Sequence, residues 1–167
     1  MRKPVIVLLA GFVAVAGIMP RMASAGTADE AQIRALEGAF AAAVKARDLD
    51  AIMKVYSPDV LVFDVSPPRQ YVGAAAYRED WKGFLAAFPG PIQFEVTDLV
   101  VSAGGALGYG HSIQHVSGKD AKGKPTEVTV RVTDVYRKAG GTWLIVHEHV
   151  SVPVDLDTGK ADLSSKP

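Results

Sequence analysis

The chain has 167 residues, no cysteine, and 18 basic side chains balanced by 18 acidic ones. The lack of cysteine excludes a disulfide framework and any metal site built on thiolates. The balanced charge, without a basic run, gives no support for binding to nucleic acid or to an anionic membrane surface.

Residues 1–25 have the composition of a secretory signal peptide. Arg2 and Lys3 precede an apolar run over 5–18, and Ala23 to Ala25 form a small-residue cleavage site. A membrane anchor is the alternative, but the run is shorter than the roughly 20 residues that cross a bilayer. We therefore expect cleavage near Ala25 and a periplasmic or secreted mature protein that has no membrane segment.

The first half of the mature chain predicts three helices. Ile33, Leu36, Phe40 and Val44 recur at helical spacing on one face. A second, short helix is expected from Asp48 to about Tyr56, followed by a short strand over 60–64. A third helix is expected over 73–88 and ends at a Pro-Gly-Pro sequence. Its inner face is expected to hold Tyr77, Trp81, Phe84 and Leu85.

The second half changes to a period of two residues, which predicts four strands over 92–102, 106–117, 126–138 and 142–153. Helices followed by a meander of strands are typical of the α+β class, with the helices on one face of an antiparallel sheet. We expect one domain over 26–153 and a flexible tail over 154–167.

Alternation along the last two strands predicts which side chains face the helices. On the third long strand, Val132 and Asp134 share the valine-rich face, so Asp134 is expected to point inward. A buried aspartate is costly unless it is paired or protonated, which makes it a candidate functional residue, although a structural pairing would explain it as well. On the last strand the inward set is expected to contain Val146, Glu148 and Val150.

The other set of the last strand contains Trp143, Ile145, His147 and His149, which are expected on the back of the sheet. Trp143 and Ile145 would then find burial in a homodimer interface. His147 and His149 lie on the same side, as metal ligands can, so metal-dependent activity is one alternative. The preferred interpretation is that they make hydrogen bonds at a surface or an interface, without a bound metal.

Three ordered segments carry a resemblance to a known family: AVKARDLDAIMKVYSPDVLVFD, YVGAAAYREDWKGFLAAF and TDVYRKAGGTWLIVHEHVS. They resemble the nuclear transport factor 2-like superfamily, specifically its SnoaL-like and ketosteroid-isomerase-like proteins. This resemblance implies a cone: a curved antiparallel sheet wrapped around three N-terminal helices, with a deep pocket at the open end.

The resemblance also implies roles for individual residues. Asp64 matches the general base of the ketosteroid isomerases, and Asp134 matches their acid that is kept protonated by an apolar site. The tyrosine that completes that site is replaced by Phe40, which has no hydroxyl, and Tyr56 is the nearby candidate to substitute for it. True steroid isomerisation is therefore not expected.

The resulting prediction is a cofactor-free pocket protein for a small apolar or carbonyl-containing molecule, with acid–base catalysis of the isomerase or dehydratase type. A non-catalytic ligand-binding or dimerisation module is the alternative from a different class. The candidate catalytic residues are Asp64, Asp134, Glu148 and Tyr56, and the candidate substrate-binding residues are Phe40, Trp81, Phe84, Val132, Val146 and Val150.

Overall fold

A computed structural model describes residues 26–164, so the predicted signal peptide lies outside the described part. The helices are α1 (Gly26–Ala46), α2 (Leu49–Met53) and α3 (Ala74–Ala87). The strands are β1 (Tyr56–Phe63), β2 (Tyr71–Val72), β3 (Gln93–Gly104), β4 (Leu107–Lys119), β5 (Pro125–Ala139) and β6 (Thr142–Ser151).

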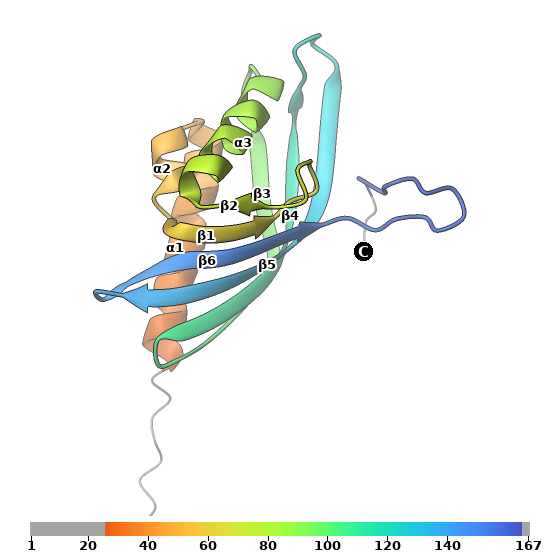
Figure 1. Ribbon diagram of the computed structural model, residues 1–167. Helices are drawn as coiled ribbons and strands as arrows, with labels where there is room; N and C mark the ends of the chain where they lie inside the picture. Colours follow the sequence, from red (N-terminus) through yellow and green to blue (C-terminus); the bar gives the residue numbers. More distant parts are fainter. Residues whose placement is uncertain (1–25, 165–167) are drawn as a thin grey trace, which may run out of the picture.

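The strands form one six-stranded sheet in the order β2-β1-β6-β5-β4-β3. Figure 1 shows this sheet bending strongly, with the helices on its concave side. The predicted α+β cone is therefore confirmed. The sheet is antiparallel except at one place, where β1 pairs with β6 in parallel.

Two details of the first half differ from the sequence prediction. The second helix ends at Met53, and Tyr56 already begins β1, where it pairs with Ile145 of β6. Strand β2 was not predicted, because two residues carry no readable alternation. It matters for the site, since Tyr71 lies on it.

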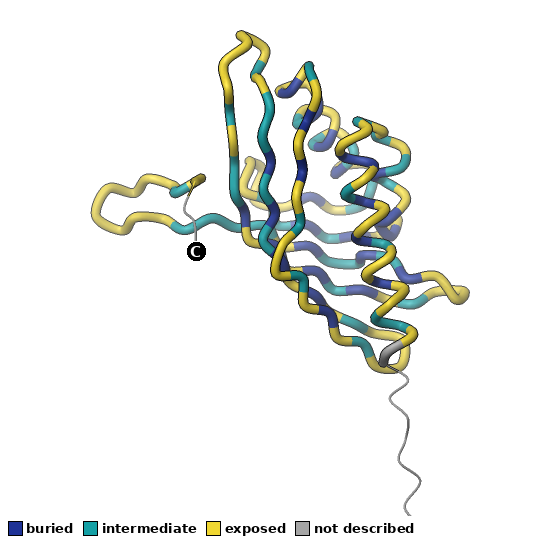
Figure 2. Tube along the Cα trace, turned by 180° about the vertical axis from the view of Figure 1, so that it is seen from behind, coloured by how far each residue is buried: buried dark blue, intermediate teal, exposed yellow. Residues whose placement is uncertain are grey.

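The core lies between the concave face of the sheet and the helices. Ile33, Phe40 and Val44 of α1 and Tyr77 and Trp81 of α3 are all buried, as the helical spacing predicted. Figure 2 shows the buried positions as a stripe along the helices and as alternate residues along the strands. The hairpin tips and the C-terminal arm are exposed.

In the first half of β6 the side chains have the opposite orientation to the one that alternation predicts. Trp143 and Ile145 are only 3% and 1% exposed and belong to the core, not to the back of the sheet. The cause is a β-bulge: Val135 pairs with His147 and Tyr136 with Ile145, which leaves Val146 without a partner. One extra residue shifts the alternation by one position, so Glu148 still faces inward.

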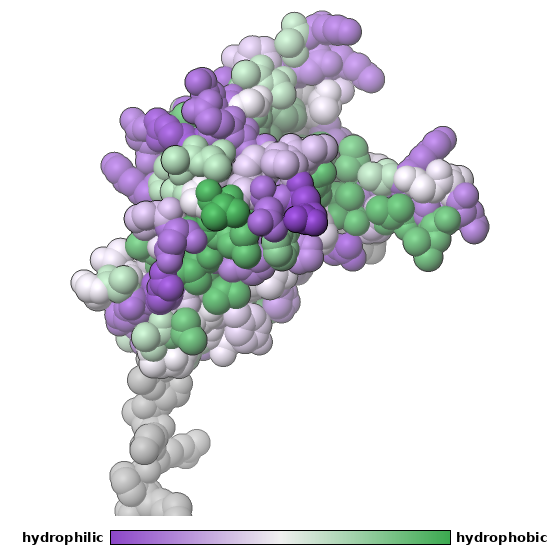
Figure 3. Space-filling view, viewed as in Figure 1, coloured by the Kyte–Doolittle hydropathy of each residue, from purple (hydrophilic) through white to green (hydrophobic). Residues whose placement is uncertain are grey.

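This bulge also removes one argument for a homodimer, because Trp143 and Ile145 obtain their burial within the chain. Figure 3 shows apolar side chains across the middle of the face formed by β1 and β6, and again along the C-terminal arm. Val72, Val154 and Leu156 are among the exposed apolar residues. Dimerisation across the back of the sheet stays a prediction.

Residues 152–164 form an arm that leaves the body of the domain at the end of β6 (Figure 1). A bridge between Val154 and Ala161 closes it, and the Leu163 carbonyl accepts from the Thr129 amide at 2.8 Å. The mobility of this tail stays a prediction. Within residues 26–164, no helix combines the length and apolarity needed to cross a membrane.

Candidate functional site

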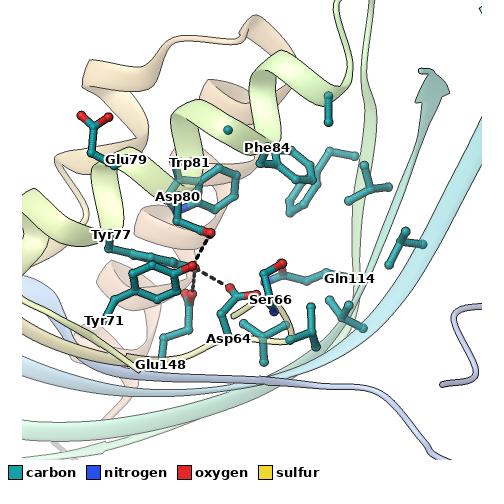
Figure 4. A pocket seen from close by; sticks show the side chains of 18 of the residues that line it. Asp64, Ser66, Tyr71, Tyr77, Glu79, Asp80, Trp81, Phe84, Gln114 and Glu148 are labelled. Carbon is teal, nitrogen blue, oxygen red and sulfur yellow. Dashed lines mark hydrogen bonds between the residues drawn. The ribbon is translucent and has the colours of Figure 1, made fainter. Parts of the chain in front are cut away.

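A cavity of about 600 Å³ lies between α3 and the concave face of the sheet (Figure 4). This volume is in the usual range of small-molecule sites. One side of the cavity is aromatic, and its rings come from α1, α3, β2 and β3: Phe40, Tyr71, Tyr77, Trp81, Phe84 and Phe94.

The opposite wall comes from alternate residues of the long strands. Val116 lies opposite Val128, and Gln114 lies opposite Val130, so the pleat turns these four side chains to the same face. Val150 of β6 continues the wall. The result is an apolar surface with one amide group, that of Gln114.

Three carboxyl groups from different elements meet at the inner end of the cavity. Asp64 follows directly after β1, Asp80 lies on α3, and Glu148 lies on β6. Asp64 Oδ1 accepts from the backbone amide of Ser66 at 3.0 Å, which orients this carboxyl. The Tyr71 hydroxyl donates to Asp80 Oδ1 at 2.6 Å.

The Tyr77 hydroxyl joins two of these carboxyls. It lies 2.5 Å from Glu148 Oε1 and 3.3 Å from Asp64 Oδ2 (Figure 4). A hydroxyl has one proton and can both donate and accept, so Tyr77 provides a path for a proton between Asp64 and Glu148.

Glu148 is buried, and this burial raises its pKa to about 7. The hydroxyls of Tyr77 and Tyr56, the latter 2.9 Å from Oε2, oppose that rise because they donate to the ionised form. The negative charges of Asp64 and Glu37 raise the pKa of Glu148 further. Glu148 can therefore exist in either protonation state at neutral pH.

A second buried acidic cluster lies behind Glu148. Asp134 faces Glu148 across the β5–β6 ladder, and burial followed by the charges of Glu148 and Glu37 raises its pKa well above the usual range. The Tyr136 hydroxyl donates to Glu37 Oε1 at 2.8 Å. Burial also raises the pKa of Glu37, and this hydrogen bond lowers it.

The cavity wall contains six of the residues that the sequence singled out: Asp64, Glu148, Phe40, Trp81, Phe84 and Val150. It does not contain Tyr56, Asp134, Val132 or Val146. Tyr56 contacts Glu148 from behind, and Asp134 and Val132 are buried in the sheet. Val146 is the bulged residue, so the alternation that assigned it to the wall does not hold there.

The wall residues that the sequence prediction omits include Tyr77, Tyr71, Asp80 and Gln114. Tyr77 was placed on the inner face of its helix but not assigned a role, and Gln114 could have been found from alternation, two residues before Val116. No sequence signal marked Tyr71, whose position depends on the pairing of β2 with β1. Asp80 lies three residues after Tyr77 and four before Phe84, so helical spacing places it on the same face of α3.

The histidine pair lies outside the cavity. His147 Nδ1 is 2.8 Å from the Leu61 carbonyl oxygen, and the rings of His147 and His149 pack against Phe63. Between residues 26 and 164, no group of three or more histidine, cysteine or acidic side chains is placed to hold a metal ion.

Comparison with known proteins places this architecture in a family. The sequence profile of the SnoaL-like domain matches residues 33–155, which include every element except the start of α1. The chain belongs to the SnoaL-like family. A search of curated proteins finds no match to it.

Solved structures agree with this assignment. The SnoaL-like chain is 34% identical to a nuclear transport factor 2-like protein of unknown function from Pseudomonas putida KT2440, with a TM-score of 0.77 over 84% of this chain and 98% of that one. A ketosteroid isomerase-like protein from Erwinia carotovora atroseptica is 19% identical, with a TM-score of 0.65 over 75% and 96% of the two chains.

A nuclear transport factor 2-like superfamily protein from Salmonella enterica serovar Typhimurium is 16% identical, with a TM-score of 0.68 over 80% of this chain and 96% of that one. At such low identity the last two likenesses concern the fold alone. Together with the family match, they confirm the superfamily that the sequence motifs indicated.

Proposed function

We propose that this SnoaL-like protein binds a small, largely apolar molecule in the cavity and moves a proton on it without a cofactor, in a reaction of the isomerase or dehydratase type. The observation that carries the proposal is the Tyr77 hydroxyl between Asp64 and Glu148. An acid and a base in one cavity, linked by a hydroxyl, can remove a proton at one atom of a ligand and return it at another.

Asp64 is the better candidate for the base. It is half-buried, so it stays accessible to a ligand, and the Ser66 amide holds its Oδ1. A proton taken by Asp64 can pass to the Tyr77 oxygen while Tyr77 gives its own proton to Glu148. Asp64 is then ready to act again, and Glu148 holds the proton.

Glu148 is the matching acid. Its pKa of about 7 lies near neutral pH, where a group both holds and releases a proton effectively. Tyr56 and Tyr77 fix its two oxygens in place. The apolar walls limit the water that would compete for the proton.

Two features separate this site from that of a steroid isomerase. Phe40 brings no hydroxyl to the cavity, and Asp134 lies behind the wall and not on it. The proposed chemistry therefore depends on Asp64, Tyr77 and Glu148. The signal-like residues 1–25 support the further proposal that the protein acts outside the cytoplasm.

Proton transfer can be tested without knowing the natural substrate. The probe is 2-tetralone in D₂O near pH 7, and NMR follows exchange of the protons next to its carbonyl. We expect the protein to accelerate this exchange over buffer. Asp64→Asn should lower the protein-dependent rate by about 10²- to 10⁴-fold, the usual contribution of a general base. Tyr77→Phe should lower it by a smaller factor.

Ser66→Ala is the matched control, because Ser66 lines the same cavity but contributes only its backbone amide to Asp64. Its exchange rate should equal that of the wild type. An Asp64→Asn protein as fast as the wild type would contradict the assigned base. A protein that binds apolar molecules but exchanges no faster than buffer would favour the non-catalytic binding module.

A further inference from the structure

The charged groups of the cavity all have the same sign. Among its lining residues Asp64, Asp80, Glu79 and Glu148 are acidic, and none is a lysine, arginine or histidine. Glu79 is exposed and lies 3.4 Å from Lys82. Within residues 26–164, the other three carboxyls form no ion pair, so their partners are hydroxyls and one backbone amide.

Two further polar groups in the wall lack a partner. The indole Nε1 of Trp81 is buried without a hydrogen bond among the described residues. Gln114 is 7% exposed, and none of the hydrogen bonds within 26–164 involves its side chain, which points from β4 into the cavity (Figure 4). Buried polar groups are normally paired, so the Gln114 amide, whose oxygen can accept from an N–H donor, indicates that a polar ligand completes the site.

The aromatic side of the cavity adds a second attraction for positive charge. Tyr71 and Trp81 line the same cavity as Asp80. The face of an aromatic ring attracts a cation, and the attraction grows when both are removed from water.

From the uncompensated carboxyls, the unpaired Gln114 amide and the rings, we infer that the cavity selects an apolar molecule that carries a protonated amine. The ammonium group lies at Asp64 and Asp80, and the apolar body lies against Phe84 and the valines of β4 and β5. This inference rests on the proposed ligand-binding function and names the class of ligand for it.

The same arrangement discriminates against other ligands. A carboxylate or phosphate would enter a space whose charged groups are all acidic, and no lining side chain could pair with it. A neutral apolar molecule would displace water from Asp64 and Asp80 without replacing the hydrogen bonds that the water donates to these carboxylates. An ammonium group supplies both the charge and the hydrogen-bond donors that these oxygens accept.

Three probes of one shape test this selection: 2-naphthylmethylamine, 2-naphthylmethanol and 2-naphthoate, titrated by calorimetry into the wild-type protein at pH 7.5. We expect the amine to bind at least tenfold more tightly than the alcohol, and the carboxylate to bind more weakly than both. In Asp64→Asn and Asp80→Asn the preference for the amine should fall several-fold, while affinity for the alcohol stays within about twofold.

Glu95→Gln is the control, since Glu95 is exposed and lies outside this cavity. It should leave all three affinities unchanged. An alcohol that binds as tightly as the amine would overturn the inference but leave the proposed pocket intact. Absence of binding by all three probes would also overturn it. The proposed proton transfer is tested separately by the 2-tetralone experiment, and it fails if the protein does not accelerate that exchange.

Discussion

At the scale of single residues, the buried carboxyls of Glu148 and Glu37 accept from tyrosine hydroxyls and form no ion pair within residues 26–164. Tyr56 and Tyr77 donate to Glu148, and Tyr136 donates to Glu37. An arginine partner would hold a carboxyl ionised at all physiological pH values, whereas a hydroxyl satisfies its oxygen and leaves it able to titrate. The choice of partner is what leaves Glu148 able to serve as the proposed acid.

The clearest residue-scale test is Tyr136→Phe. This change removes the donor to Glu37 Oε1 and leaves a buried acceptor without it, while the ring keeps its packing. We expect the free energy of unfolding to fall by about 1–3 kcal/mol, measured by urea denaturation. Tyr109→Phe, at a tyrosine that is 51% exposed, is the control and should change it by less than about 0.5 kcal/mol. Equal effects of the two changes would contradict a structural role for the hydrogen bond.

At the scale of elements, alternation predicted most of the sheet because Val128, Val130 and Val132 identify the inner face of β5. It failed on β6 because a bulge is one residue that leaves the ladder, and strict alternation does not allow for it. The one hint was that Trp143 and Ile145, both strongly apolar, fell on the back of the sheet and needed a dimer interface for their burial.

The site was predictable only where a residue follows the rule of its own element. Phe40, Trp81 and Phe84 follow helical spacing, and Glu148 follows the strand beyond the bulge. Tyr71 joins the site through the pairing of β2 with β1, a contact between segments that no local pattern reports. Asp134 was correctly predicted to be buried, but burial alone does not put a residue on a cavity wall.

The close approach of β4 to its neighbours gives an element-scale prediction. A Cβ added at Gly110 would lie 3.0 Å from the Tyr136 hydroxyl oxygen and 3.1 Å from the Val100 carbonyl oxygen. Gly110→Ala therefore forces a shift in a packed strand, and we expect a loss of about 1–3 kcal/mol in the free energy of unfolding. Gly104→Ala is the matched control, because a Cβ there meets nothing within 4 Å. Thermal denaturation of both variants and the wild type measures this loss. A Gly110→Ala protein as stable as the wild type would contradict the close packing at Gly110.

At the scale of the whole molecule, the cone concentrates acidic groups where water is excluded. Burial raises the pKa of Glu148, Asp134, Glu37 and Asp80 together. Each of these carboxyls binds its proton more tightly in the folded chain than in the unfolded chain. Folding is therefore coupled to pH through the same groups that form and support the site.

This coupling has a definite sign. Glu148 has a model-peptide pKa of 4.5 and a folded pKa of about 7, so between these values the folded chain keeps a proton that the unfolded chain has released. The contribution of Glu148 is complete below pH 4.5 and is lost as pH rises to about 7, a difference on the order of 3 kcal/mol for a shift of this size. We expect the free energy of unfolding to be higher at pH 5 than at pH 8, measured by urea denaturation across this range.

Glu148→Gln should flatten that profile, because glutamine has no proton to release and brings no charge near Asp134. Glu95→Gln, at an exposed position, should follow the wild-type profile. A wild-type protein whose stability rises from pH 5 to pH 8, or a Glu148→Gln protein with an unchanged slope, would show that Glu148 is ionised throughout. Its role as the acid would then fail, and Asp64 would have no partner of suitable pKa for the proposed transfer.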